Sequence, residues 1–208
     1  MQTQTYKTPN LDNKTVQKIL EAALGCWTRD GYHGASLKEI ADRAGVAKSL
    51  VHYHFQSKEH LLIELQAMHC RRVALNVRDR LLSSTPSFES GLSAMDQVFD
   101  AMIEVRHQFP FALEVWRASM QNQAVRERMH SFEEEILALF KEGVETTLGP
   151  LAQRLRLPAD RLAELLQVAL GGFELKLFLN PDIPRLRRTY DDFKMLVMLA
   201  LNSGGTPS

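Results

Sequence analysis

The stretch Ser36–Leu62 constrains the fold of this chain more than any other segment. Ser36 precedes an apolar periodic segment and has Glu39 three residues later, a capping-box pattern that predicts the start of a short helix. Gly45 follows, and glycine enters a left-handed backbone conformation without steric cost. A second short segment, Ala47–Phe55, comes next. We therefore expect two short helices joined by a tight turn, the layout of a helix-turn-helix.

The rest of the chain also has helical periodicity, and no segment alternates as a strand would, so the expected fold class is all-α. A first helix should begin at Asp12 or Asn13 and end at Gly31. A long helix should run from Lys58 to Leu82, roughly 37 Å at 1.5 Å per residue, which is enough to link two bodies. Further helices are expected at about Phe88–Gln108, Pro110–Met120, Ala124–Thr147, Ala159–Leu179 and Arg185–Asn202.

Composition and charge fit a cytoplasmic protein with a basic N-terminal part. Apolar residues make up 45% and charged residues 24% of the chain, as in ordinary globular proteins. The net charge is zero, but residues 1–80 hold 12 Lys/Arg against 8 Asp/Glu, whereas residues 81–208 hold 13 against 17. The basic part contains the turn motif, which suits contact with phosphates. We expect no membrane association, because the longest apolar run, Met195–Leu201, is too short to span a bilayer.

The second short helix should have one core face and one exposed polar face. At 100° per residue, Ala47, Val51 and Phe55 fall on one side, so they are expected to face the core. The opposite face is centred on Ser49 and Tyr53 and includes hydroxyl, imidazole and ammonium groups that can contact phosphates and base edges. Its flanking residues are Leu50, His52 and Lys48. Lys58 lies in the first turn of the next helix, whose amide-rich end suits a phosphate.

These residues resemble the signature of the TetR family of bacterial transcriptional regulators over about fifty residues, from Val16 to Leu65. The matching positions are Gly31-Tyr32, Ser36-Leu37, Ile40-Ala41, Ala44-Gly45-Val46, Tyr53-His54-Phe55 and Ser57-Lys58-Glu59. The resemblance implies a homodimer in which each subunit places its second short helix in the major groove of a palindromic operator. It also implies a helical C-terminal domain that binds a small effector and thereby releases the double-stranded DNA. We accordingly expect a DNA-binding domain at residues 1–57, together with the start of the helix from Lys58, and an effector-binding and dimerisation domain at residues 58–208.

By position, eight residues match family positions that contact DNA. They are Ser36, Lys38, Lys48, Ser49, His52, Tyr53, His54 and Lys58. The family usually has tyrosine where this chain has His52. An imidazole can still donate a hydrogen bond to phosphate, but its protonation could make DNA affinity sensitive to pH.

The C-terminal part is rich in aromatic and methionine residues at helix-inward spacings. Such side chains either fill a core or line a cavity for an apolar or aromatic ligand, and our ligand-binding candidates are Phe99, Met102 and Trp116. The last two long helices are expected to form the dimer interface, as a four-helix bundle across a two-fold axis. The interface candidates are Leu166, Ala169, Gly172, Phe173, Phe193 and Val197.

The sequence gives little support for an enzyme. His52 and His54 lie on different faces of a short helix and lack acidic partners at metal-ligand spacing, while His69 and Cys70 point about 100° apart. We predict no catalytic residue, no metal and no cofactor. The leading hypothesis is a repressor released by an apolar or aromatic effector. The alternatives are a ligand-dependent activator, a helical adaptor acting mainly through protein contacts and, last, an enzyme on a helical bundle.

Overall fold

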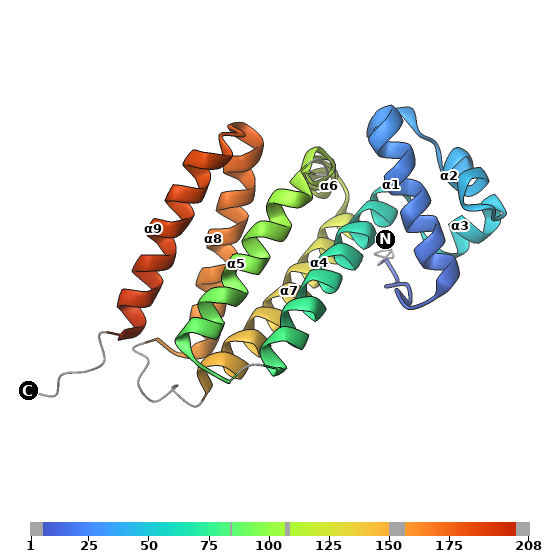
Figure 1. The fold of residues 1–208 in the computed structure, drawn as a ribbon. Coiled ribbons are helices and arrows are strands. Elements are labelled where there is room, and N and C mark those ends of the chain that lie inside the picture. The colour runs from blue at the N-terminus through green and yellow to red at the C-terminus, as the bar shows by residue number, and fades with distance from the viewer. Residues whose placement is uncertain (1–5, 84, 107–108, 150–156, 203–208) are drawn as a thin grey trace, which may run out of the picture. The chain divides into compact units, whose positions relative to one another are not determined.

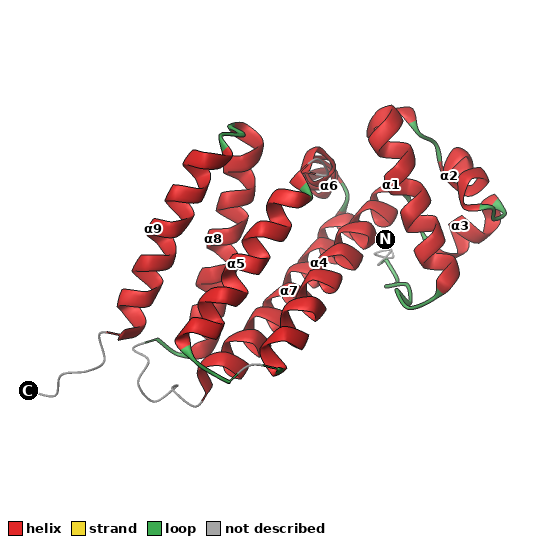
Figure 2. Cartoon of the chain, in the orientation of Figure 1, coloured by secondary structure: helices red, strands yellow, loops and turns green. Residues whose placement is uncertain are grey.

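A computed structural model describes residues 6–83, 85–106, 109–149 and 157–202. Within these ranges the chain forms nine α-helices and no strand, so the all-α prediction is confirmed (Figures 1 and 2). The helices are α1 Lys14–Gly34, α2 Leu37–Ala44, α3 Lys48–His54, α4 Lys58–Leu82, α5 Phe88–Glu104, α6 Phe109–Gln121, α7 Gln123–Leu148, α8 Ala159–Leu179 and α9 Ile183–Asn202. No helix in the described ranges combines the length and the apolar character needed to cross a membrane.

The expected helix limits hold to within one or two residues for α4, α6, α7, α8 and α9. Helix α1 begins where predicted, because the side chain of Asn13 accepts hydrogen bonds from the backbone amides of Thr15 and Val16. It kinks at Gly31, where φ is 73° and ψ is 166°, and one further turn follows. Helix α5 ends at Glu104, whereas the predicted end at Gln108 lies outside the described residues.

The chain divides into two compact units, each with its own core. The first comprises residues 1–70 and 110–133, and the second comprises residues 71–109 and 134–208. Helices α4 and α7 therefore contribute residues to both units.

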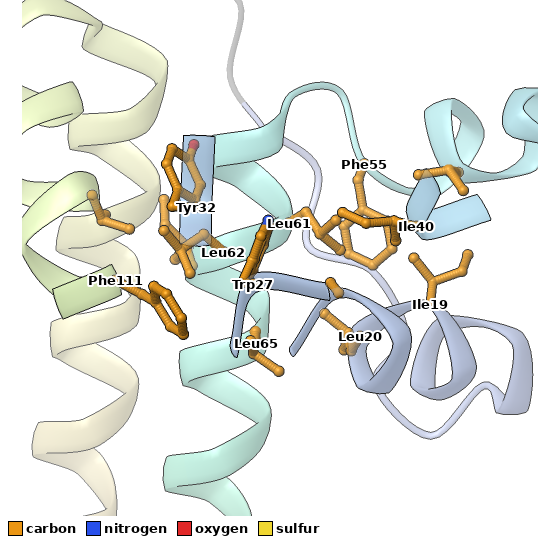
Figure 3. Close-up of a cluster of buried hydrophobic side chains, with 14 of the residues drawn as sticks. Ile19, Leu20, Trp27, Tyr32, Ile40, Phe55, Leu61, Leu62, Leu65 and Phe111 are labelled. Atoms are coloured by element: carbon orange, nitrogen blue, oxygen red, sulfur yellow. The ribbon is translucent and has the colours of Figure 1, made fainter. Parts of the chain in front are cut away.

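The core of the first unit joins α1 to parts of α4 and α6 (Figure 3). The ring of Trp27 lies 6.0 Å from that of Phe111, and Leu62 and Leu65 are buried in the same cluster. Because these α4 and α6 side chains complete the first core, the expected domain boundary between residues 57 and 58 falls inside the first unit.

A buried ion pair connects α4 to α7 within the first unit. The Arg128 guanidinium donates a hydrogen bond of 3.0 Å to Glu64 Oε2, and both side chains are almost wholly buried. His60 Nε2 lies 3.3 Å from Glu64 Oε1. Burial alone would raise the pKa of Glu64, but His60 and the charge of Arg128 outweigh it and lower this pKa. Glu64 is thus held as a carboxylate among apolar neighbours.

The second unit has two apolar clusters. One joins α7 to α8 and includes Leu148, Leu162 and Leu166. The other joins α5, α8 and α9, where the ring of Phe99 stacks on that of Tyr190 at 4.0 Å and meets Phe173 edge-on. Helices α8 and α9 are thereby packed against each other and against α5.

Candidate functional site

The turn between α2 and α3 has the predicted geometry. The Ser36 hydroxyl accepts a hydrogen bond from the backbone amide of Glu39, and the Glu39 carboxylate accepts one from the backbone amide of Ser36. Gly45 closes α2 with φ 67° and ψ 34°, and the amide of Val46 donates to the carbonyl of Ala41. This left-handed residue turns the chain directly into α3.

Helix α3 holds a polar face away from the core. Val51 and Phe55 are fully buried, whereas Tyr53 is 79% exposed and Ser49 is exposed on the same side. The predicted orientation of these four residues is therefore confirmed. The inward orientation predicted for Ala47 is wrong, because this residue caps the helix and its side chain is exposed before the first turn.

The remaining DNA-binding candidates differ in accessibility. Lys38, Lys48 and His52 are exposed, and Ser36 is exposed although its hydroxyl is used in the cap. His54 is half-buried between Tyr53 and Phe55, and burial lowers its pKa.

Lys58 is a DNA-binding candidate whose side chain is held by contacts within the folded chain. Its ammonium donates a hydrogen bond to the backbone carbonyl of Tyr32 and lies 4.4 Å from the centre of the Tyr32 ring. Burial lowers the pKa of Lys58. Glu59 accepts a hydrogen bond of 3.2 Å from the Tyr32 hydroxyl. The first turn of α4 is therefore attached to the kinked end of α1.

Tyr6 supports the same helix end, and sequence reasoning missed it. Its hydroxyl lies 2.8 Å from Ser57 Oγ, which also accepts a hydrogen bond from the amide of His60. Its ring stacks on the His60 ring at 4.5 Å. His60 Nδ1 in turn accepts a hydrogen bond from the amide of Gln56. No local pattern signals this cluster, because Tyr6 reaches it across fifty residues of sequence.

The three ligand-binding candidates do not lie together. Phe99 is fully buried in the stacked cluster of the second unit, and Met102 packs against that cluster. Trp116, which is 38% exposed, belongs to the first unit.

A cavity of about 130 Å³ lies elsewhere in the second unit, among α4, α5, α7, α8 and α9. Its walls are almost entirely apolar, with Leu75, Leu81, Met95, Phe140 and Leu170 among the described residues that line it. Sequence reasoning missed these positions because a cavity-lining leucine and a core leucine have the same helical spacing.

The dimer-interface candidates are mostly turned inward. Of the six, only Gly172 is exposed; Leu166 and Phe173 are buried, and the other three are half-buried. An apolar row on α8 and α9 that shares only Gly172 with these candidates faces away from the core, and we call it the outer ridge. The outer ridge consists of Leu165, Val168, Gly172, Leu175, Leu179, Met195, Leu196 and Leu199.

No group of three or more His, Cys, Asp or Glu side chains in the described residues is placed to hold a metal ion.

Comparisons with known proteins agree with this geometry. The family of bacterial regulatory proteins called the tetR family matches residues 19–65. The transcriptional activator FasR of Mycolicibacterium smegmatis is 35% identical over 83 residues, 40% of this chain and 38% of FasR. The transcriptional repressor AcnR of Corynebacterium diphtheriae is 25% identical over 84% of this chain and 87% of AcnR.

The fold is also found in solved structures. That of the regulator FadR from Bacillus subtilis, in complex with stearoyl-CoA, aligns with a TM-score of 0.66 at 16% identity over 91% of this chain and 99% of FadR. Residues 19–65, with the α2–α3 turn at their centre, form the family's helix-turn-helix, and the remaining helices complete its fold. Residues 19–65 therefore carry the helix-turn-helix of the tetR family of bacterial regulatory proteins, and the chain has the fold of solved TetR transcription regulators.

Proposed function

We propose that this regulator is a homodimeric repressor that binds a palindromic operator through α3 and is released by an apolar small molecule. The observation that carries the proposal is the polar face of α3, where Ser49 and Tyr53 are exposed while Val51 and Phe55 hold the helix to its core. A short helix anchored on one side and polar on the other can enter the major groove.

On this proposal the contacts divide into two kinds. Ser49, His52 and Tyr53 reach base edges or nearby phosphates, and Lys38 and Lys48 contribute phosphate contacts. Ser36 and His54 are supporting positions, since the hydroxyl of the first caps α2 and the ring of the second is half-buried.

The Lys58 ammonium has three N–H groups and uses one of them on the Tyr32 carbonyl, so another can donate to a phosphate. We expect its contribution to DNA affinity to be smaller than that of an exposed lysine, because the contacts with the Tyr32 carbonyl and ring restrict where the ammonium can move.

The outer ridge supports the proposed dimer. Its α8 members follow one another at alternating intervals of three and four residues, which is the spacing of a seam between two helices. Val168 is 73% exposed, Leu179 is 66% exposed and Leu196 is 65% exposed, and such a row is more stable when covered by a second copy. Gly172 lies within the row and lets a partner helix approach closely.

The apolar cavity supports the proposed effector. A pocket with apolar walls and a few polar groups is the usual form of a small-molecule site. The structural relative FadR was solved with stearoyl-CoA, whose long acyl chain is apolar, and we propose an apolar ligand for this chain as well. Repression is preferred to activation because AcnR, the repressor, matches most of this chain, whereas FasR, the activator, matches less than half.

The test is DNA binding by the purified full-length chain, measured by footprinting on the region upstream of its own coding sequence at moderate salt. We expect protection of one short palindrome, and loss of that protection with Tyr53→Ala or Ser49→Ala while the dimer persists in sedimentation. Ser131→Ala is the matched control, since Ser131 is exposed on α7 in the same unit but lies far from α3 in sequence. Absence of any protected palindrome, or full protection by the Tyr53→Ala variant, would refute the proposal.

A further inference from the structure

Among the described residues, one cationic side chain lines the apolar cavity of the second unit. This is Arg78 on α4, and Glu142, Thr146 and Thr147 on α7 line the cavity with it. The remaining described residues of the lining are aliphatic, aromatic, methionine or glycine. Whatever occupies the cavity therefore meets polar groups almost only along this α4–α7 side.

The two threonines already have hydrogen-bond acceptors. The Thr146 hydroxyl donates to the backbone carbonyl of Glu142 at 2.7 Å, and the Thr147 hydroxyl donates to that of Gly143 at 2.8 Å. A hydroxyl has a single proton to donate, so neither threonine offers a ligand a donor without breaking its own bond.

Arg78 differs from the threonines. Its Nε is buried and has no hydrogen-bond partner. The nearest acidic oxygens are Asp79 Oδ1, 3.9 Å from Nε, and Glu142 Oε1, 3.9 Å from Nη1, and both distances exceed a hydrogen bond. A buried donor without an acceptor is unfavourable and calls for a specific explanation. An acceptor supplied by a ligand would satisfy this donor.

The chemistry of the donor limits the ligand. The Nε edge of a guanidinium presents two parallel N–H groups, Nε and one Nη, that match the two oxygens of a carboxylate. A neutral alcohol or a hydrocarbon would leave at least one of these donors unsatisfied. Apolar walls and a guanidinium edge together fit a molecule with an apolar body and a single acidic end.

The size of the cavity limits the apolar body. A cavity of about 150 Å³ lined by aliphatic and aromatic residues holds a benzene molecule, and this one measures about 130 Å³. The buried part of the ligand should thus be of that order, which suits a medium-length alkyl chain or a single ring. A longer chain would need the walls to move apart.

We propose that the cavity binds an apolar carboxylic acid whose carboxylate lies on the Nε edge of Arg78. This inference rests on the proposed effector site and names the class of ligand that the site takes. Glu142 acts against the ligand, since its carboxylate lies at the same guanidinium and repels a second anion.

The experiment uses octanoate and octanol, which share an eight-carbon chain and differ in the acidic end. Their binding to the full chain is measured by titration calorimetry without DNA. We expect the wild type to bind octanoate about tenfold or more tightly than octanol, as for a hydrogen-bonded charge. Arg78→Gln should abolish this preference and leave octanol affinity unchanged. Arg80→Gln is the matched control, because Arg80 is exposed on the same helix and outside the described lining.

Glu142→Gln provides an independent readout, since removing the competing carboxylate should tighten octanoate binding severalfold without changing octanol binding. Circular dichroism verifies that each variant is folded. Equal affinity for the two probes, no binding of either, or an octanoate preference that survives Arg78→Gln would overturn the inference. The proposed repressor function would survive these outcomes if octanol or another neutral ligand released the operator, and it fails only in the separate footprinting experiment.

Discussion

Gly31 and Gly45 both have positive φ, but their ψ angles place them in different regions of backbone space. Gly45, at φ 67° and ψ 34°, is left-handed helical, a conformation that asparagine also tolerates. Gly31, at φ 73° and ψ 166°, lies in a region that is essentially restricted to glycine. A Cβ added at either position would meet no atom within 4 Å. Substitutions at the two sites therefore differ in backbone strain and not in crowding.

This contrast predicts that Gly31→Asn destabilises the chain by about 2 kcal/mol or more, whereas Gly45→Asn costs less than about 1 kcal/mol. Urea denaturation of the two variants beside the wild type measures the difference. Equal losses of unfolding free energy at the two positions would show that the kink at Gly31 relaxes when a side chain is present.

Glu174 on α8 is a half-buried carboxyl group whose burial raises its pKa to about 7. Its ordinary pKa is 4.5, so the folded chain holds this proton to a higher pH than the unfolded chain does. The resulting stabilisation is complete below about pH 4.5 and is lost as the pH rises to about 7. Above that pH the Glu174 carboxylate is charged in apolar surroundings, which lowers the unfolding free energy by roughly 2 to 3 kcal/mol.

We therefore expect Glu174→Gln to increase the unfolding free energy at pH 8 and to change it little at pH 5. Glu164→Gln, at an exposed position on the same helix, is the control and should show no such dependence on pH. Urea denaturation of both variants and the wild type at the two pH values provides the test. If Glu174→Gln increased the unfolding free energy equally at pH 5 and pH 8, burial would not raise the pKa of Glu174.

At the scale of elements, local patterns predicted the helices well where the helix ends carry strong signals. The capping box at Ser36 and the left-handed glycine at Gly45 form hydrogen bonds only with residues at most four positions away. The α2–α3 turn can therefore be predicted without knowledge of the tertiary structure. The same holds for the outward face of α3, where Ser49 and Tyr53 lie opposite the buried Val51, as a rotation of 100° per residue requires.

Tertiary packing determines which face of a helix is buried, and local sequence patterns do not show this. Helix α8 carries apolar residues on more than one face, and periodicity alone does not tell the face that packs inside the chain from the face left exposed. The interface candidates therefore lie largely on the inner face, as Phe173 does, whereas Leu165 and Val168 of the outer ridge are exposed. The contact of Lys58 with Tyr32 escaped sequence reasoning for a similar reason, because it joins two helices.

The outer ridge predicts where the proposed dimer can be broken. Val168→Glu places a charge in the middle of the ridge, and a buried unpaired charge opposes association strongly. We expect this variant to sediment as a folded monomer at concentrations where the wild type is a dimer. Leu82→Glu, which alters an exposed leucine on α4 outside the ridge, should remain dimeric. A dimeric Val168→Glu variant would place the interface on another surface.

At the scale of the whole molecule, helix α3, the proposed DNA-binding helix, and the cavity belong to different compact units. Two helices have residues in both: α4 contributes Leu62 and Leu65 to the first core and Leu75 to the cavity, and α7 contributes Arg128 to the buried ion pair and Phe140 to the cavity. If the proposed effector weakens operator binding by some factor, the operator must weaken effector binding by the same factor. We propose that the two helices shared by both units, α4 and α7, carry this coupling.

Helix α4 can be interrupted where the first unit gives way to the second. Proline inside a helix removes a hydrogen bond and clashes with the preceding turn, so Arg72→Pro breaks α4 just after residue 70 and before the cavity-lining positions. We expect this variant to bind operator and octanoate separately while octanoate no longer changes operator affinity. Arg72→Ala removes the same side chain, keeps the helix and should retain the coupling.

Fluorescence anisotropy of labelled operator, titrated with and without saturating octanoate, measures the coupling factor. If Arg72→Pro couples the two ligands as strongly as Arg72→Ala does, an intact α4 is unnecessary and α7 is the element that links the sites.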